Sequence, residues 1–581
     1  MTGRARLHAG RAMPGRNIAR GTLPRAGLAL AAGALVAASV PPFGIWPLGP
    51  AGVGLLAVLL AGRGPRSRAL IGLVAGIAQF AVGCTWALAF TAAGYVGLVA
   101  VQAVFTALAC AVVPPGRGRL LALAGALTLA EWVRDSWPLG GMPLGGAALG
   151  QAGGPLLALA RAGGPLLVAA GVFLAGAGVG ALASGLAERH LGGALAGGCA
   201  LVLVAAGAGA ATFAPDGGSP VGHVRAALVQ GGGRRGLDQL EVPASTVFAA
   251  SLDESRRLSG PLDVVLWPED VVRLGAPLAA SPVDALLGAL AHRLGATLLA
   301  GVTEPVGATR FRNEIVAWGP TGHVVATFEK VHPVPFGEYV PFRSLLSHLF
   351  DLADVPRDAV RGHGSGMIAT PAGRFAVLVS YETFFAERGR AGVRAGAELM
   401  VVPTNTASYA TSQVPSQELA ASRLQAVGEG RDLLQAATTG FTAEIDQRGD
   451  VLARTRLGVP ALLRVVVPLR RGATLYERFG DLPVLVLALL ALLAGRAAAF
   501  GGRRGMRRRR DPGPGEARVV QPASIGRSTE VSSSSSPSNV EAEAVAPAAP
   551  SPDISAGLAM GAGFLNRIRL KRTNLPIHMT P

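Results

Sequence analysis

The chain has 581 residues, of which 50% are hydrophobic and only 15% charged, with 80 glycines and a positive mean hydropathy. This composition excludes an ordinary soluble globular protein and predicts a protein that is largely embedded in a membrane. The formal net charge of +17 does not require a nucleic-acid partner, because the arginines cluster between apolar stretches, as topology signals do.

Eight apolar stretches are candidates for membrane-spanning helices, each of which needs about 20 residues. They lie near residues 26–42, 48–62, 69–92, 95–113, 119–133, 157–186, 191–213 and 482–500, and the second is short. With a cytoplasmic N-terminus, every arginine cluster then falls on the cytoplasmic side, as the positive-inside rule expects. We therefore expect a basic cytoplasmic arm over 1–25, a transmembrane domain of about seven helices over 26–213, and a C-terminal transmembrane helix over 482–500.

Residues 214–481 lie between the seventh and eighth stretches and are expected on the extracytoplasmic side. Short β-branched runs, such as Val224–Val229 and Phe375–Ser380, alternate there with helical stretches such as Ser416–Glu429. This alternation is typical of a layered α/β domain. Residues 501–581 are first Arg-rich and then rich in Pro, Ser and Ala, so we expect a disordered cytoplasmic tail whose basic start binds anionic lipid.

Cofactor chemistry is not expected in this domain. The three cysteines, Cys84, Cys110 and Cys199, all lie in apolar stretches, and the nine histidines show no ligand spacing. The sequence therefore predicts no disulfide framework, no metal and no other cofactor.

Lysine usage identifies the first candidate for a catalytic residue. Only two of the 53 basic residues are lysines, and Lys330 is the only one outside the far C-terminal tail. A lysine in such an arginine-rich chain indicates a role for a compact ammonium group, which a planar guanidinium does not supply. A leftover surface lysine is the alternative.

Other polar side chains follow predicted strands. Glu269 comes just after Val264–Leu266, where burial would favour a general base, although a solvated carboxylate at a helix start is an equal alternative. Ser380 ends another predicted strand, and Glu338 and Glu382 stand close by in sequence. A carboxylate, an ammonium and a nucleophile together would form an acyl-transfer site, in which the ammonium stabilises the oxyanion.

These motifs resemble a known family. Trp-Pro-Glu at 267–269, Lys330 followed by Val-Pro-Phe-Gly-Glu-Tyr at 334–339, and Tyr381-Glu382 after a strand are similar to the carbon-nitrogen hydrolase (nitrilase) superfamily. With seven spans before the domain and one after it, and with Glu131-Trp132-Val133-Arg134 before Gly141-Met142-Pro143, residues 26–500 resemble the bacterial apolipoprotein N-acyltransferase family.

The resemblance implies a fold and a reaction. The fold would be a polytopic helical membrane protein with an inserted extracytoplasmic αββα domain, in the bacterial inner membrane. The reaction would move an acyl chain from a phospholipid through an acyl-enzyme to the α-amine of a lipoprotein's diacylglyceryl-cysteine. Glu269 matches the general base, Lys330 the oxyanion-stabilising lysine, and Glu338 and Glu382 the supporting carboxylates. Asn313 and Asn405 would position these groups or fix loops, with ordinary turn asparagines as the alternative.

The chain departs from the family at the nucleophile, where Ser380 replaces a cysteine. A serine depends on a base to remove its proton during attack, whereas a thiol with a pKa near 8.5 ionises readily. Gln425 and Gly428 also replace the family's more usual arginine and glutamate.

Three functions are therefore kept open. The first is an acyltransferase using Ser380, expected to act as a monomer on a phospholipid donor and a lipoprotein acceptor. The second is a non-catalytic homologue that binds lipoprotein or lipid and assists an active paralogue. The third is a membrane-anchored amide hydrolase, which the many spans make the least favoured.

Overall fold

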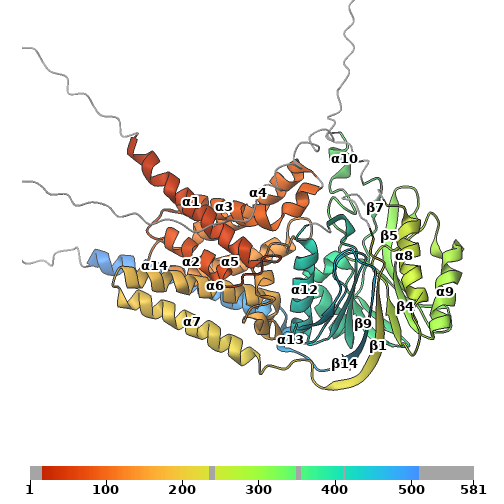
Figure 1. Ribbon diagram of the computed structural model, residues 1–581. Helices are drawn as coiled ribbons and strands as arrows, with labels where there is room; N and C mark the ends of the chain where they lie inside the picture. The colour runs from red at the N-terminus through yellow and green to blue at the C-terminus, as the bar shows by residue number, and fades with distance from the viewer. Residues whose placement is uncertain are drawn as a thin grey trace, which may run out of the picture. The chain divides into compact units, whose positions relative to one another are not determined.

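The computed structural model describes residues 16–89, 91–233, 242–348, 352, 355–409 and 412–508 (Figure 1). Most of the predicted N-terminal arm and of the tail, including Arg509 and Arg510, lies outside the described residues. The chain divides into two compact units, and the larger holds residues up to Pro341 together with Val355–Gly502. In the smaller unit, Phe342–Asp354 contains the short helix α10 (Arg343–Leu346).

Each predicted apolar stretch contains a helix. The helices are α1 (Arg16–Ser39), α2 (Leu48–Leu59), α3 (Pro65–Gly83), α4 (Ala92–Val112), α5 (Arg119–Ser136), α6 (Ala160–Ala187), α7 (Leu191–Ala211) and α14 (Leu482–Arg508). Four segments of the described chain are long and apolar enough to cross a membrane, namely Ala92–Val112, Leu157–Ala187, Leu191–Ala211 and Leu482–Ala499. The segments Pro24–Ser39 and Leu48–Leu59 are apolar but shorter.

Three helices differ in extent from the predicted segments. Helix α1 begins at Arg16, inside the expected basic arm, and α14 continues to Arg508, inside the expected disordered tail. Arginine is a good helix former, so a helix in an apolar stretch also includes residues of a neighbouring arginine-rich stretch. The third predicted span is also too long, since α3 ends at Gly83 and a 3-10 turn, η1 (Thr85–Ala89), follows it.

Small residues bring the helices of this bundle together. A Cβ atom added to Gly33 of α1 would lie 1.9 Å from the Ala75 carbonyl oxygen of α3. A Cβ atom at Gly52 of α2 would lie 2.4 Å from the Ala32 carbonyl oxygen of α1. Backbone contacts this close are typical of helix packing in membranes, where small side chains provide the interface.

The region after α7 contains two β-sheets in its described residues. One has eight strands in the order β14-β1-β2-β4-β5-β6, with β3 and β7 at its side, and the other has the order β13-β12-β11-β10-β9-β8. The strands of the first sheet are β1 (Pro220–Gln230), β2 (Val264–Leu266), β3 (Val272–Arg273), β4 (Thr297–Val306), β5 (Arg310–Trp318), β6 (Val324–Glu329), β7 (Asp358–Ala359) and β14 (Ala461–Arg470). Those of the second are β8 (Met367–Thr370), β9 (Gly373–Val377), β10 (Leu399–Thr404), β11 (Leu433–Ala437), β12 (Ala443–Ile445) and β13 (Val451–Arg454).

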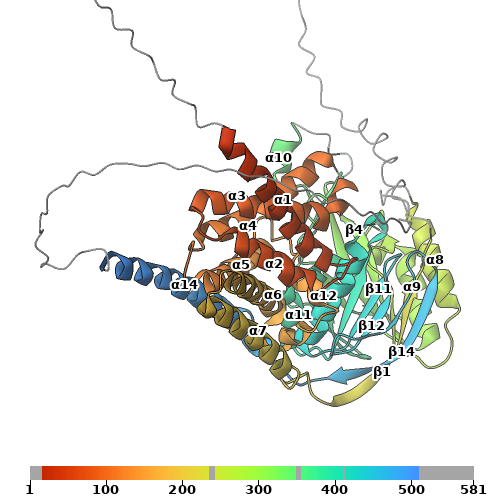
Figure 2. The same ribbon diagram turned by 60° about the vertical axis from the view of Figure 1, so that its left-hand side comes forward.

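The buried side chains define four layers. One apolar cluster joins the two sheets, since it contains Leu228 and Leu299 of the first sheet and Phe375 and Val401 of the second. The outer face of the first sheet packs on helices α8 (Ala244–Arg256) and α9 (Pro282–Leu294), and that of the second packs on α11 (Ala386–Arg394) and α12 (Val414–Glu429) (Figures 1 and 2). The expected αββα arrangement is thereby confirmed.

Helix α12 is the element of the α/β region that contacts the helical bundle most extensively. It packs on α6 and on the 3-10 turns η2 (Ala147–Gln151) and η3 (Leu157–Leu159) (Figure 2). Gln417 of α12 accepts a hydrogen bond from the Gly145 N–H at 2.9 Å and donates one to the Gly83 carbonyl oxygen at 3.2 Å. Because Gln417 is fully buried, these bonds satisfy backbone groups that water does not reach.

Candidate functional site

Strand ends bring the predicted charged residues together. Glu269 follows β2 after Trp267 and Pro268, Lys330 directly follows β6, and Asn405 directly follows β10. Glycine at 301 on β4 makes room for the first of these segments, because a Cβ atom there would lie 2.5 Å from the Glu269 Cα. The polar groups gather at strand ends, as the sequence predicts for an α/β fold.

Lys330 lies at the centre of a buried ion network. Its Nζ donates to Glu269 Oε1 at 2.8 Å and to Glu338 Oε1 at 2.9 Å. The Asn313 amide donates to the same two oxygens, at 2.9 and 2.8 Å. Lys330 is 2% exposed and Glu269 is 4% exposed. This burial excludes the alternatives of a leftover surface lysine and of a solvated carboxylate.

The charged groups of this network shift one another's pKa values. Burial raises the pKa of Glu269, and the neighbouring ammonium of Lys330 opposes that rise. Burial alone would lower the pKa of Lys330, but the carboxylates of Glu269 and Glu338 outweigh it and hold the pKa well above its ordinary value. Lys330 therefore keeps its positive charge at neutral pH and can stabilise a negative oxygen.

Ser380 lies on a tight turn rather than at a strand end. Strand β9 ends at Val377, and Ser380 begins the 3-10 turn η6 (Ser380–Phe384) with a φ of +50°. A left-handed conformation at a residue other than glycine is strained and is often found at functional positions. The predicted strand Phe375–Ser380 therefore extends too far. Strand β9 ends at Val377, and the Val379 N–H donates to the Glu382 carboxylate of the turn.

Glu382 holds this turn against the segment after Lys330. Its carboxylate accepts hydrogen bonds from the backbone N–H groups of Val379 at 2.9 Å, Val331 at 2.7 Å and His332 at 3.2 Å. Glu382 is fully buried, and the pKa of its carboxyl is raised by that burial. It therefore links the serine turn to the lysine segment.

Asn405 fixes the loop after β10. Its backbone N–H donates to Glu269 Oε2 at 3.1 Å, and its side-chain oxygen accepts hydrogen bonds from Thr438 at 2.8 Å and from the Ala407 N–H at 3.2 Å. Asn313 and Asn405 are thus both part of the polar network around Glu269, and Asn405 also makes the usual asparagine turn, in which its side-chain oxygen accepts from the N–H two residues on.

Two buried polar residues beside Ser380 were not predicted. Thr404 Oγ1 lies 3.1 Å from Ser380 Oγ and 2.6 Å from Glu418 Oε1, and both residues are at most 1% exposed. Thr404 ends β10 next to Asn405, so the strand-end rule could have identified it. Glu418 stands within α12, and nothing in its sequence surroundings marks it as buried.

A loop after α5 contacts the residue next to Ser380. Tyr381, directly after Ser380, donates from its hydroxyl to the Gly141 carbonyl oxygen at 3.0 Å. Arg134 of α5 bonds the Met142, Leu144 and Pro143 carbonyl oxygens and the Glu131 carboxylate. The buried ion pair of α5 therefore shapes the loop on which Tyr381 rests.

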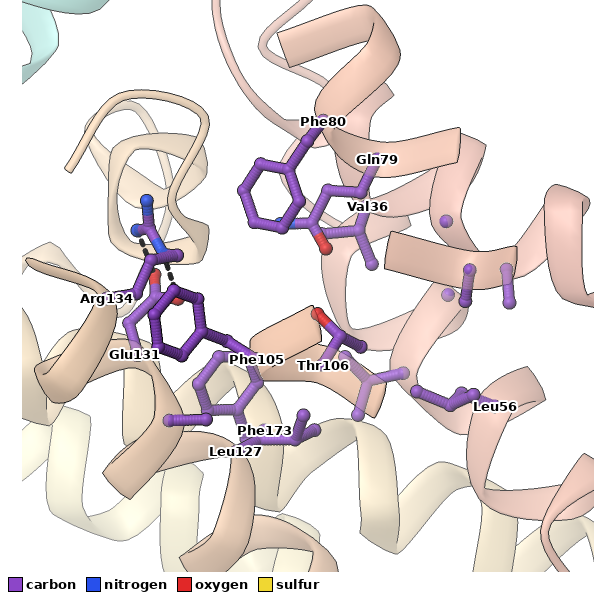
Figure 3. Close-up of a pocket in the computed structure, with 16 residues that line it drawn as sticks. Val36, Leu56, Gln79, Phe80, Phe105, Thr106, Leu127, Glu131, Arg134 and Phe173 are labelled. Carbon is purple, nitrogen blue, oxygen red and sulfur yellow. Dashed lines mark hydrogen bonds and ion pairs between the residues drawn. The ribbon is translucent and has the colours of Figure 1, made fainter. Parts of the chain in front are cut away.

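The Glu131 and Arg134 pair also closes one end of a narrow apolar cavity among α1 to α6 (Figure 3). Phe80, Phe105 and Phe173 line it, and none of the residues around it is one of the predicted site residues. The cavity is therefore separate from the acid, lysine and serine.

The substituted positions in α12 have clear packing roles. Gln425 donates from its amide to the carbonyl oxygens of Thr383 and Phe385, both at 3.0 Å, and so supports the turn that carries Ser380. At Gly428 a Cβ atom would make an ordinary van der Waals contact with the Tyr476 ring at 3.4 Å, so α12 packs on that ring here.

Two family descriptions match the chain. The Apolipoprotein N-acyltransferase N-terminal domain matches residues 32–178, and Carbon-nitrogen hydrolase matches residues 240–467. The first match covers most of the helical bundle, and the second covers most of the two-sheet region.

Three similar proteins carry the same name. An apolipoprotein N-acyltransferase of Methylococcus capsulatus is 30% identical over 528 residues, which are 85% of this chain and 98% of the relative. One of Allorhizobium ampelinum is 31% identical over 481 residues, covering 74% and 88% of the two chains. One of Geobacter metallireducens is 32% identical over 273 residues, covering 46% and 51%.

Two solved structures each match less than half of the chain. A nitrilase-superfamily protein of Saccharomyces cerevisiae is 18% identical and covers 43% of this chain and 91% of its own, with a TM-score of 0.32. An amidase of a Nesterenkonia species is 21% identical and covers 46% and 97%, also with a TM-score of 0.32.

Proposed function

Because the chain belongs to the apolipoprotein N-acyltransferase family, we propose that it transfers a fatty acyl chain from a phospholipid to a lipoprotein. The acceptor is the α-amine of the N-terminal diacylglyceryl-cysteine, and the acyl chain passes through an ester on Ser380. The family relation rests on relatives that are aligned over more than four fifths of their length. No cofactor enters this reaction.

The observation that carries the proposal is the buried network around Lys330. Nζ is held at 2.8 and 2.9 Å from two carboxylates, and Glu382 ties the segment after Lys330 to the strained turn that carries Ser380. In the proposed reaction Ser380 attacks the ester carbonyl of the phospholipid, and Lys330 stabilises the oxyanion. Glu269 acts as the general base toward the attacking amine of the acceptor, while Glu338, Asn313 and Asn405 hold Lys330 and Glu269 in place.

The non-catalytic alternative is disfavoured by the same network. Burying an ammonium and its carboxylates costs free energy, and a site without turnover gains nothing from keeping that arrangement. The amide-hydrolase alternative is disfavoured by the four long apolar helices, since a water-soluble substrate does not need them.

A transfer assay tests the proposal. The purified protein in detergent is incubated with a phospholipid and a diacylglyceryl-cysteine peptide, and the N-acylated peptide is measured by mass spectrometry. We expect product with the natural chain, none with Ser380→Ala, and more with Ser380→Cys. Product with Ser380→Cys alone would favour the non-catalytic alternative, and release of free fatty acid without peptide acylation would favour a hydrolase.

The proposal includes a topology. All eight helices would cross the bacterial inner membrane, with a transmembrane domain over 26–213, a last span over 482–500 and the α/β domain of 214–481 on the extracytoplasmic side, in a monomer. Positive-inside charges support this orientation.

Accessibility of introduced cysteines tests the topology. Leu457→Cys and Arg66→Cys, both at exposed positions, are made in a Cys199→Ser background and treated in intact spheroplasts with a membrane-impermeant thiol reagent. We expect labelling at position 457 only, and labelling at position 66 after permeabilisation. The reverse pattern would overturn the orientation.

A further inference from the structure

Ser380 Oγ lies at the end of a chain of three oxygen atoms, and the other two belong to the buried residues Thr404 and Glu418. Thr404 Oγ1 is 3.1 Å from Ser380 Oγ and 2.6 Å from Glu418 Oε1. Glu418 Oε2 is also buried and has no hydrogen-bond partner among the described residues. Glu418 therefore has a spare acceptor position in a place that water does not reach.

The number of protons decides the direction of these bonds. A threonine hydroxyl carries one proton, so Thr404 can donate to only one of its two neighbours. An ionised carboxylate can only accept, and it forms the stronger bond, so Thr404 donates to Glu418 when Glu418 is ionised. The Ser380 hydroxyl must then donate to Thr404.

Both carboxylate oxygens of Glu269 are occupied by other partners. Its Oε1 accepts from Lys330 and Asn313, and its Oε2 accepts from the Asn405 N–H. Among the described residues, the hydrogen bond of the Ser380 hydroxyl goes to Thr404 and not to Glu269. The carboxylate that receives the serine proton most directly in this geometry is Glu418.

We propose that Thr404 and Glu418 form a proton relay for Ser380, in which Thr404 touches the reacting oxygen and Glu418 is a positioning residue that accepts the proton through it. This inference deepens the proposed function and rests on it, because it assigns the first proton transfer of the same site. It also gives a reason why a serine can stand at this position, since a serine needs a base during its attack.

The proposed step is balanced in atoms and protons. The bond between Ser380 Oγ and the acyl carbon forms, and the ester bond between that carbon and the glycerol oxygen breaks. The serine proton moves to Thr404, whose own proton moves to Glu418. The same path then returns one proton to the leaving glycerol oxygen, so the lysophospholipid departs neutral at that oxygen. In the second half, the amine nitrogen forms a bond to the acyl carbon and the bond between that carbon and Ser380 Oγ breaks, while the amine proton, taken by Glu269, ends on Ser380 Oγ.

The environment of Glu418 suits this role. The pKa of Glu418 is raised to about 8, chiefly by burial and also by the charge of Glu269, while the hydrogen bond from Thr404 and the charge of Lys330 oppose the rise. The relay needs the ionised form of Glu418. The reactivity of Ser380 should therefore increase as the pH rises through about 8.

A probe of serine reactivity tests the relay independently of the natural donor. A fluorophosphonate reacts with an activated serine, releasing fluoride as the new oxygen–phosphorus bond forms. Labelling of Ser380 is followed by peptide mass spectrometry in the natural chain, in Glu418→Gln and in Thr404→Val. The matched pair Ser380→Cys and Ser380→Cys with Glu418→Gln is alkylated with iodoacetamide, since a thiol ionises without a relay.

We expect labelling of Ser380 to fall by about 100-fold in Glu418→Gln and in Thr404→Val, the usual range for loss of acid–base catalysis. Alkylation of the cysteine should change by less than about twofold when Glu418→Gln is added, because the pair isolates the coupling to serine. The pH dependence near 8 should disappear in Glu418→Gln.

Three results would overturn the relay. They are an unlabelled Ser380 in the natural chain, an equal loss in the serine and cysteine backgrounds, and labelling that Glu418→Gln does not change. If labelling follows the relay but the phospholipid gives no transfer product, then the relay stands and the proposed function fails.

Discussion

Two groups of polar residues in the site differ in how they are built. We call Lys330, Glu269 and Glu338 the lysine side, and Thr404 and Glu418 the threonine side. On one side Lys330, Glu269 and Glu338 form an ion network in which each charge has a partner at 2.8 to 2.9 Å. On the other side Thr404 and Glu418 form a chain of neutral and titratable oxygens, with one carboxylate oxygen unpartnered. The first side holds a fixed charge for an oxyanion, and the second side holds a place for a proton.

This difference explains how a site can keep its charged residues while its nucleophile changes from cysteine to serine. A fixed ammonium stabilises the oxyanion whether sulfur or oxygen attacks. The proton of a serine, however, needs an acceptor, and Glu418 supplies one without disturbing the ion network. The lysine side is therefore general to either nucleophile, and the threonine side is specific to serine.

Removing the ammonium of Lys330 should have the largest effect on activity. We expect Lys330→Met to lower peptide acylation by about 100-fold or more, as loss of an oxyanion donor does. Because Glu269 and Glu338 would then face each other without a cation, the free energy of unfolding should fall by about 3–5 kcal/mol. Acylation kinetics and thermal unfolding measure both effects.

Arg225→Met is the control, because Arg225 forms an exposed ion pair with Asp263 and takes no part in the site. An exposed pair contributes about 0–1 kcal/mol, so this variant should keep both activity and stability. Full activity in Lys330→Met would contradict a role for the ammonium.

Glu382→Gln should separate the two sides and give an intermediate effect. The carboxylate bonds three backbone N–H groups, and an amide can accept at one oxygen only, so the serine turn and the lysine segment lose their common support. We expect a loss of about tenfold in kcat with a smaller change in KM, since about 1.4 kcal/mol corresponds to tenfold. An unchanged kcat would show that Glu382 does not hold the reacting groups.

Tyr381→Phe should have the smallest effect on activity of these three substitutions. It removes one hydrogen bond, from the Tyr381 hydroxyl to the Gly141 carbonyl oxygen, and leaves the ring packed. The expected cost is about 1 kcal/mol, or about fivefold in activity with the lipid donor. Fluorophosphonate labelling of Ser380 should hardly change, and a large loss there would place Tyr381 in the serine's own chemistry.

The sequence predicted the lysine side well because it consists of side chains at strand ends, where a short motif determines position. Glu269, Lys330 and Asn405 all follow strands, and the helices of the bundle match the apolar stretches. The sequence did not predict the threonine side, because Glu418 reaches Ser380 from a helix whose buried face is set by its contacts with β10 and η6. The turn at Ser380 was also missed, since its positive φ depends on the bonds that Glu382 makes to distant backbone groups.

The most direct measurement is mass spectrometry of the intact protein after incubation with a phospholipid and no acceptor. The account predicts an acyl ester, mapped to Ser380, that disappears in Ser380→Ala and is released when a diacylglyceryl-cysteine peptide is added. A natural chain that stays unmodified while Ser380→Cys forms a thioester would contradict it.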